Sequence, residues 1–261
     1  MTAARTAAWL ACAAGLVGSA AAQAQTTPAG VRDSVRLAPL DTVGGMQPVM
    51  DNTIFSHAFL SQLEDRTDGG GHEFRYAGQA WSGTDYDKLW IKSEGRTDNR
   101  GRFTDGQHDF LYDRAVSTYF DVQAGVRVDL DRDVTRTWAA LGVQGLSLYF
   151  FDLEATAYVG DRGRFAARVE SFYDILLTNR LILQPQVELN FYTRSDPQRG
   201  VGSGLSDLDA GLRLRYELSR KFAPYIGVTY LGTFGQAQNY ARAQGGIAGD
   251  VRFAFGLRAW F

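Results

Sequence analysis

Sulfur and imidazole side chains near the N-terminal end are the first candidates for chemistry. Met46, Met50 and His57 lie within twelve residues of one another. Thioethers suit soft ions such as Cu(I), and imidazole suits several transition metals. A pair of methionines four positions apart is a weak pattern by itself, because it often arises by chance. His72 and His108 fall in or beside expected loops, where a solvated histidine is the ordinary interpretation.

Acidic residues on the polar faces of expected strands form a second group of candidates. Their carboxylates could pair with basic side chains on neighbouring strands and fill a narrow interior. They could also line a polar path for ions or small solutes, and the residues alone leave both interpretations open. The members of this group are Asp121, Asp129, Glu154, Glu170, Glu188, Asp207, Asp209 and Glu217.

Catalytic patterns are weak in this chain. His57 and Ser61 are four positions apart, but neither G-x-S-x-G nor H-x-S-x-G occurs, so a nucleophile with its base is not indicated. No glycine-rich loop follows a strand and opens a helix, which leaves nucleotide binding without support. The formal net charge of −2 argues against a nucleic-acid partner. The sequence therefore predicts a protein that is not an enzyme.

The N-terminal segment has the features of a secretory signal. Residues 1–24 contain one arginine, an apolar run and a closing Ala22-Gln23-Ala24. A short membrane helix is the alternative, but the run is too short to span a bilayer comfortably. The single cysteine, Cys12, lies inside this segment, so the processed chain would use neither a disulfide nor a thiolate. Residues 25–52, punctuated by proline and glycine, are expected to form a flexible arm.

The closing stretch GDVRFAFGLRAWF shows how the rest of the chain is organised. Its odd-numbered positions from Val251 to Phe261 are all apolar, whereas the positions between them carry all the charge. Such alternation predicts a strand with one apolar and one polar face. The same pattern recurs along the chain, most cleanly over residues 119–130. We therefore expect residues 53–261 to form an all-β, closed antiparallel transmembrane barrel of about twelve strands.

The lengths of the connections support that strand count. When strands are counted back from Phe261, the three longest connections, 98–106, 194–205 and 234–249, all fall at one end of the barrel. Bacterial outer-membrane barrels have an even strand number, long outer loops and short periplasmic turns. A secreted β-sandwich is the alternative, but its strands are usually shorter. Aromatic residues also gather near the expected strand ends, as in the girdles of membrane barrels.

Several long motifs carry a family resemblance. GQAWSGTDYDKLWIKSEG at residues 78–95 resembles the outer-membrane copper resistance protein B family, and so do RTWAALGVQGL, GVGSGLSDLDAGLRLRYELSRKFAPYIGV and the closing RAWF. The resemblance runs from about Met46 to Phe261. It implies a barrel in the outer membrane of a Gram-negative bacterium, with its N-terminal arm in the periplasm. It also implies that copper ions are bound or transported, in tolerance or homeostasis.

The resemblance further implies a set of partners and a departure from the family pattern. Members commonly carry a Met- and His-rich N-terminal segment, which this chain reduces to Met46 and Met50, with His57 just beyond. The expected partners are outer-membrane lipid, the barrel-assembly machinery acting on Phe261, and a periplasmic multicopper oxidase or copper carriers. A monomer is expected. The alternatives are a general porin-like barrel without metal preference and a barrel plugged by its own charges.

Overall fold

The computed structural model describes residues 53–261 apart from 69–70, 99–100, 132–133 and 244–248. The expected signal peptide and arm, together with Met46 and Met50, lie outside the described residues. Among the helices that the model does describe, none combines the length and the apolar character that a membrane crossing would need.

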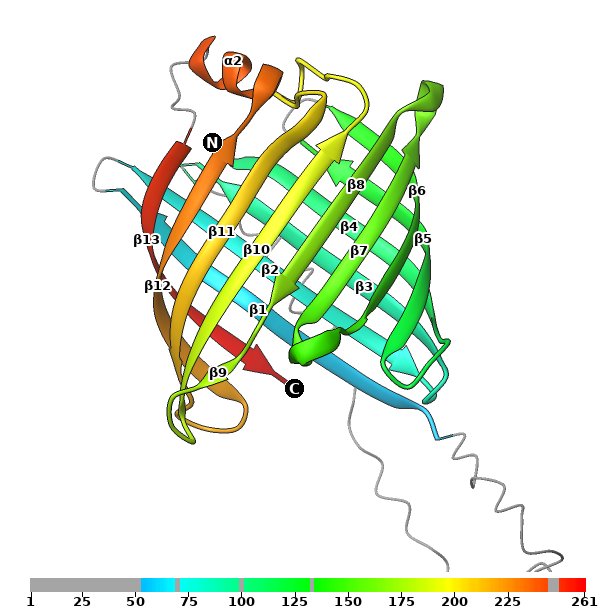
Figure 1. Cartoon of the computed structure of the whole chain (residues 1–261), viewed down its shortest axis with the longest axis vertical. Coiled ribbons are helices and arrows are strands. Elements are labelled where there is room, and N and C mark those ends of the chain that lie inside the picture. The colour runs from blue at the N-terminus through cyan, green and yellow to red at the C-terminus, as the bar shows by residue number, and fades with distance from the viewer. Residues whose placement is uncertain (1–52, 69–70, 99–100, 132–133, 244–248) are drawn as a thin grey trace, which may run out of the picture. The chain divides into compact units, whose positions relative to one another are not determined.

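A single antiparallel sheet closes on itself, because the first strand pairs with the last (Figure 1). β8 and β9 both pair with β10 and form two parts of one crossing, so the thirteen segments make the twelve crossings predicted from the sequence. The strands are β1 (Phe55–Thr67), β2 (His72–Gly83), β3 (Asp87–Thr97), β4 (Phe103–Ala115), β5 (Phe120–Leu130), β6 (Thr135–Leu146), β7 (Asp152–Gly160), β8 (Phe165–Phe172), β9 (Ile175–Leu176), β10 (Leu181–Tyr192), β11 (Gly204–Tyr216), β12 (Phe222–Thr233) and β13 (Gly249–Trp260).

The alternation of apolar and polar residues separates the outer surface from the lumen as predicted. On β13, the side chains of Val251 and Phe253 are 59% and 60% exposed, whereas Ala254 between the outward positions is 0% exposed. Arg252 points inward and donates a hydrogen bond to Glu73 of β2 at 2.6 Å. An apolar outer surface and a charged interior reverse the usual arrangement of a soluble sheet, and they fit a barrel surrounded by lipid.

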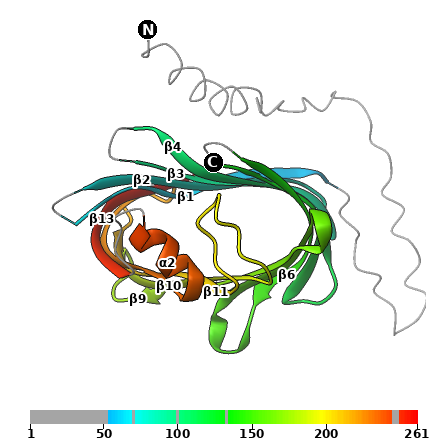
Figure 2. The ribbon, with the colours of Figure 1, turned by 90° about the horizontal axis from the view of Figure 1, so that it is seen from above.

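The barrel is flattened when it is viewed along its axis (Figure 2). β1, β2 and β3 lie on one long wall, and β10 and β11 lie on the wall facing it. Flattening brings side chains of facing strands within reach of one another, so long charged residues can meet across the lumen.

The two ends of the barrel differ in their connections. We call them the short-turn end and the long-loop end. The short-turn end carries connections 84–86, 116–119, 147–151, 177–180 and 217–221, and the long-loop end carries 68–71, 98–102, 131–134, 161–164, 193–203 and 234–248. Connection 193–203 lies across the long-loop mouth (Figure 2).

Three helical segments interrupt connections that the sequence predicted as plain loops or strand. They are η1 (Leu148–Phe150), η2 (Asp161–Gly163) and α2 (Gly235–Ala243). β7 begins only at Asp152, because Tyr149 and Phe150 have φ angles of 65° and 63° and turn the chain within η1. α2 packs beside connection 193–203: a Cβ atom on Gly202 would lie 2.5 Å from the backbone nitrogen of Ala237.

Candidate functional site

Charged side chains from facing walls meet in the lumen and form what we call the transverse ion-pair layer. Glu64 of β1 accepts hydrogen bonds from Arg66 at 2.7 Å and from Arg213 of β11, whose two nitrogens each lie 3.0 Å away. Arg66 also reaches Asp209 of β11 at 2.7 Å. The members of the layer are Glu64, Arg66, Arg75, Glu94, Arg168, Glu188, Asp209 and Arg213.

Arg75 of β2 is the centre of this layer. Its guanidinium donates to Glu188 of β10 at 2.9 Å, to Glu94 of β3 at 3.3 Å, and to Asp209. Arg168 of β8 binds Glu94 as well and lies 3.2 Å from Glu188. Isolated charges are costly to bury, so these residues are retained here only as a mutually neutralising set. The layer links β1–β3 to β8–β11 and fills the lumen nearer the long-loop end.

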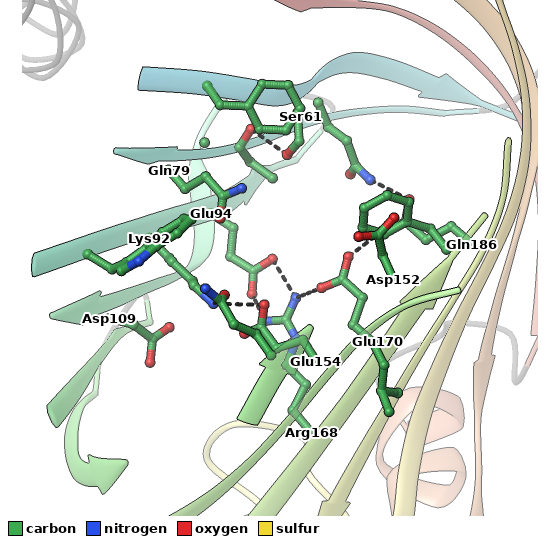
Figure 3. Close-up of a pocket in the computed structure, with 18 of the residues that line it drawn as sticks. Ser61, Gln79, Lys92, Glu94, Asp109, Asp152, Glu154, Arg168, Glu170 and Gln186 are labelled. Carbon is green, nitrogen blue, oxygen red and sulfur yellow. Dashed lines mark hydrogen bonds and ion pairs between the residues drawn. The ribbon is translucent and has the colours of Figure 1, made fainter. Parts of the chain in front are cut away.

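A cavity of about 440 Å³ lies between this layer and the short-turn end (Figure 3). Thr118, Tyr119 and Leu146 line it near the turns. Six acidic and four basic residues line it, which leaves a formal excess of two negative charges. They are Glu94, Asp109, Asp121, Asp152, Glu154 and Glu170, with Arg75, Lys92, Arg168 and Arg258. The cavity therefore has the charge to attract small cations.

The eight carboxylates predicted from the sequence are distributed between the layer, the cavity and the two barrel ends. Each of them has at least one cationic or hydrogen-bonding partner. The pairs are Asp121 with Lys88 (3.2 Å), Asp129 with Arg127 (2.6 Å), Glu154 with Lys92 (2.7 Å), Glu170 with Arg168 (3.2 Å), Glu188 with Arg75 (2.9 Å), Asp207 with Asn190 (2.8 Å), Asp209 with Arg66 (2.7 Å) and Glu217 with Arg215 (3.9 Å). This geometry fits the pairing interpretation; a path for ions stays a prediction.

The three histidines lie apart from one another, and Met46 and Met50 lie outside the described residues. His57 lies on β1 at the short-turn end, where its ring centroid is 6.2 Å from that of Trp81. His108 lies on the outward face of β4 and is hydrogen-bonded to Ser93 at 3.0 Å, while His72 is an exposed neighbour of Asp65. Over the described parts of the chain, no three or more His, Cys, Asp or Glu residues are grouped to hold a metal ion.

Aromatic rings from the adjacent strands β13, β1, β2 and β3 line one side of the lumen near its short-turn end. The centroids of Trp81 and Trp90 are 6.1 Å apart on neighbouring strands. The guanidinium of Arg258 lies 4.5 Å from the ring centroid of Phe59 and 5.8 Å from that of Trp260. Stacking of this kind holds a cationic group against an apolar surface. It fixes Arg258 beside the cavity, where the arginine contributes one of the four positive charges.

A register shift in β1 explains why both Phe59 and Gln62 reach the lumen. The pairing of β1 with β2 slips between Leu60 and Gln62, so one extra residue is accommodated. Phe59, Ser61 and Gln62 all line the cavity. Under strict alternation, Gln62 would point outward whenever Phe59 and Ser61 point inward. The bulge joins the aromatic half of β1 to its charged half, which begins at Glu64.

Sequence reasoning missed two acidic residues of the cavity, Glu94 and Asp109. The signal for Asp109 was available in the alternation of apolar and polar residues along β4. Phe110 and Tyr112 face outward and are 50% and 45% exposed, so Asp109 and Leu111 face inward. Asp152, two residues before Glu154, was expected on the same lumen face and lines the cavity.

Ion pairs also fix connection 193–203 over the long-loop mouth. Asp196 accepts hydrogen bonds from Arg136 at 3.2 Å and from Arg164 at 3.1 Å. Arg199 pairs with Asp131 and lies 2.9 Å from Asp129. Burial raises the pKa of the Asp131 carboxyl above its ordinary value, while Arg199 acts in the opposite direction. These contacts tie the β10–β11 connection to β5, to β6 and to the β7–β8 connection, and they cover that end of the lumen.

Comparison with known proteins adds independent information. Residues 54–261 match the family model of the copper resistance protein B precursor, CopB. A copper resistance protein B homolog of Pseudomonas syringae pv. tomato is 44% identical over 249 residues, covering 95% of this chain and 83% of that protein. Copper resistance protein B of Escherichia coli is 42% identical over 231 residues, covering 88% and 77%.

A solved structure gives the same fold at low sequence identity. The NanC porin is 13% identical, has a TM-score of 0.52, and is matched over 78% of this chain and 99% of its own. At this identity the likeness concerns only the barrel architecture.

Proposed function

Because this chain belongs to the copper resistance protein B family, we propose that it acts in copper resistance as a copper-binding barrel of the outer membrane. The wide band of exposed apolar side chains supports a lipid environment. In that setting the short-turn end faces the periplasm. The role is one of binding and handling the ion, without catalysis.

The observation that carries this proposal is the cavity at the short-turn end. Its lining has an excess of two negative charges, so it concentrates cations from the periplasmic side. The donors on the lining are carboxylate and amide oxygens, which suit Cu(II) or a hydrated ion better than Cu(I). Met46 and Met50 supply the soft donors for Cu(I) in the arm, with His57 beside the barrel entrance.

The proposed route runs from capture to storage. Copper is first held by Met46, Met50 and His57 at the periplasmic mouth and then enters the cavity. The transverse ion-pair layer lies between the cavity and the long-loop end, which supports sequestration more than free passage. Periplasmic copper carriers or a multicopper oxidase would exchange copper with this mouth. The barrel would act as a monomer in outer-membrane lipid.

A calorimetric titration tests the proposal on the purified full chain in detergent. We expect Cu(I) and Cu(II) to bind to the wild type, and a Met46→Ala/Met50→Ala variant to lose Cu(I) binding while keeping Cu(II) binding. A deletion strain should be copper-sensitive and should be rescued by the wild-type chain. A wild-type protein that binds neither ion would refute the proposal.

Single-channel recording separates the proposal from a general porin-like barrel. We expect the wild type to show little conductance, because the transverse ion-pair layer crosses the lumen. A large conductance that is the same with and without copper would favour the porin alternative and contradict the proposed role.

A further inference from the structure

Asp109 on β4 is more deeply buried than the other carboxylates that line the cavity. It is 7% exposed and lines the cavity, and its Oδ1 atom is buried without a hydrogen-bond partner. Figure 3 shows it on the cavity wall, apart from the interactions that link Glu94, Arg168 and Glu170. We infer that Asp109 is a cation-binding residue that holds a hydrated divalent cation at the inner part of the cavity. The identity of that cation as copper rests on the proposed function.

Lys92 of β3 and Arg127 of β5 lie opposite Asp109 on the two neighbouring strands, and neither forms an ion pair with it. Arg127 is its cross-strand neighbour on β5, but Nε of Arg127 donates to Asp129 at 2.6 Å and the guanidinium lies 4.5 Å from the ring centroid of Tyr158. Arg168 donates to Glu94 and to Glu170. No ion pair to Asp109 occurs within the described part of the chain, so its charge lacks a direct counter-ion from the protein.

Asp113, four residues further along β4, shows what a purely structural aspartate looks like here. It is 0% exposed and on the same inward face. Its Oδ2 accepts hydrogen bonds from Gln123 and Gln144, both at 2.9 Å, and Lys88 lies 3.6 Å from Oδ1. Oδ1 of Asp113 also lacks a hydrogen-bond partner, but its carboxylate is held by two amides and lies beside Lys88, whereas the described residues give the Asp109 carboxylate neither a hydrogen bond nor an ion pair. This contrast within one strand is the main argument for a ligand.

The chemistry of the site indicates how the cation is held. A buried carboxylate without a counter-ion is unfavourable, and a bound cation removes that penalty. Since the described residues hold no cluster of three or more metal ligands, water must complete the coordination. Divalent cations that keep several waters are commonly held by one or two carboxylates. A cavity of about 440 Å³ has room for such an ion with its water shell.

The test uses the full chain in detergent. The chain carries Met46→Ala and Met50→Ala, so that copper binding by the arm does not mask copper binding by the barrel. Cu(II) binding is measured by titration and by electron paramagnetic resonance. We expect Asp109→Asn to weaken Cu(II) binding roughly tenfold or more. The matched control, Asp113→Asn, should bind Cu(II) like the parent. Equal binding by the parent and Asp109→Asn would overturn this inference and leave the proposed function standing.

Thermal unfolding gives a second readout. Cu(II) should raise the unfolding midpoint of the parent and of Asp113→Asn, and should leave that of Asp109→Asn unchanged. If Asp109→Asn does not assemble, Asp109→Ser provides the same loss of charge in a smaller side chain. A parent protein whose midpoint and resonance spectrum do not respond to Cu(II) would also refute the site at Asp109. Cu(I) binding by the unmodified arm would then still support the proposed function.

Discussion

Replacing Arg75 with alanine should both destabilise the barrel and open its lumen. The guanidinium is 3% exposed and contacts Glu94, Glu188 and Asp209, which come from three different strands. Its removal leaves two buried carboxylates, Glu188 and Asp209, and the half-buried Glu94 short of one positive charge. Loss of one partner from a buried ion pair costs about 3–5 kcal/mol of unfolding free energy. The side-chain volume that is lost lies between the cavity and the long-loop end.

Two assays on the same protein test this reasoning. Urea unfolding in lipid vesicles, followed by tryptophan fluorescence, measures the change in unfolding free energy, and planar-bilayer recording measures conductance. We expect a fall of about 3–5 kcal/mol and a conductance above that of the wild type. Arg102→Ala is the control, because that arginine is 54% exposed and pairs with Asp98 at a loop, where an ion pair is worth about 0–1 kcal/mol.

The result that would refute the reasoning is equally definite. If Arg75→Ala and Arg102→Ala have the same stability and both remain closed, the transverse ion-pair layer neither supports the barrel nor blocks its lumen. A loss of stability without any conductance would show that the layer is structural and that other residues close the lumen.

Three further predictions concern the rest of the barrel. Arg199→Ala should release connection 193–203 from Asp129 and Asp131, so limited proteolysis should cut that connection faster than in the wild type, and an unchanged rate would show that the pairs do not hold it. Gly125→Val should reduce the yield of folded barrel, because a Cβ atom there would lie 2.0 Å from the carbonyl oxygen of Phe110; a normal yield on a heat-modifiability gel would contradict this. Phe261→Asp should lower the amount of assembled protein in cells without altering the stability of barrels refolded in vitro. Its ring is 61% exposed, and its backbone alone pairs with Ala58 at 2.9 and 3.3 Å; equal cellular assembly would disprove a role in recognition.

Much of the fold could be predicted because lipid and lumen impose opposite demands on alternate residues. That rule predicted the strand nature of β13 and the inward direction of Arg252, and the connection lengths predicted twelve crossings. The rule does not extend to connections, so α2 and the turn at Tyr149 were missed. The rule also cannot locate a bulge such as the one after Leu60, because one extra residue in a strand gives no recognisable signal in the sequence.

The pairing of lumen residues could not be predicted from the sequence for a different reason. Arg75 and Glu188 are 113 positions apart, and their contact depends on the flattening of the barrel and on the register of every strand between them. The sequence placed Glu188 on a polar face without indicating its partner. The isolation of Asp109 was equally hidden, since an unpaired residue is recognised only after its neighbours have been assigned to other partners.

The transverse ion-pair layer also constrains the order in which the barrel can be completed. Arg66 and Asp209 are 143 positions apart, and Glu64 and Arg213 are 149 apart, so β1 must wait for β11 before its charges are neutralised. A sheet that ends at β10 would leave Arg75 without Asp209 and Glu64 without Arg213. Such a partial sheet is poorly suited to lipid, because its charged face has no opposing wall. The closed barrel is therefore the arrangement in which the charges of the layer meet their partners.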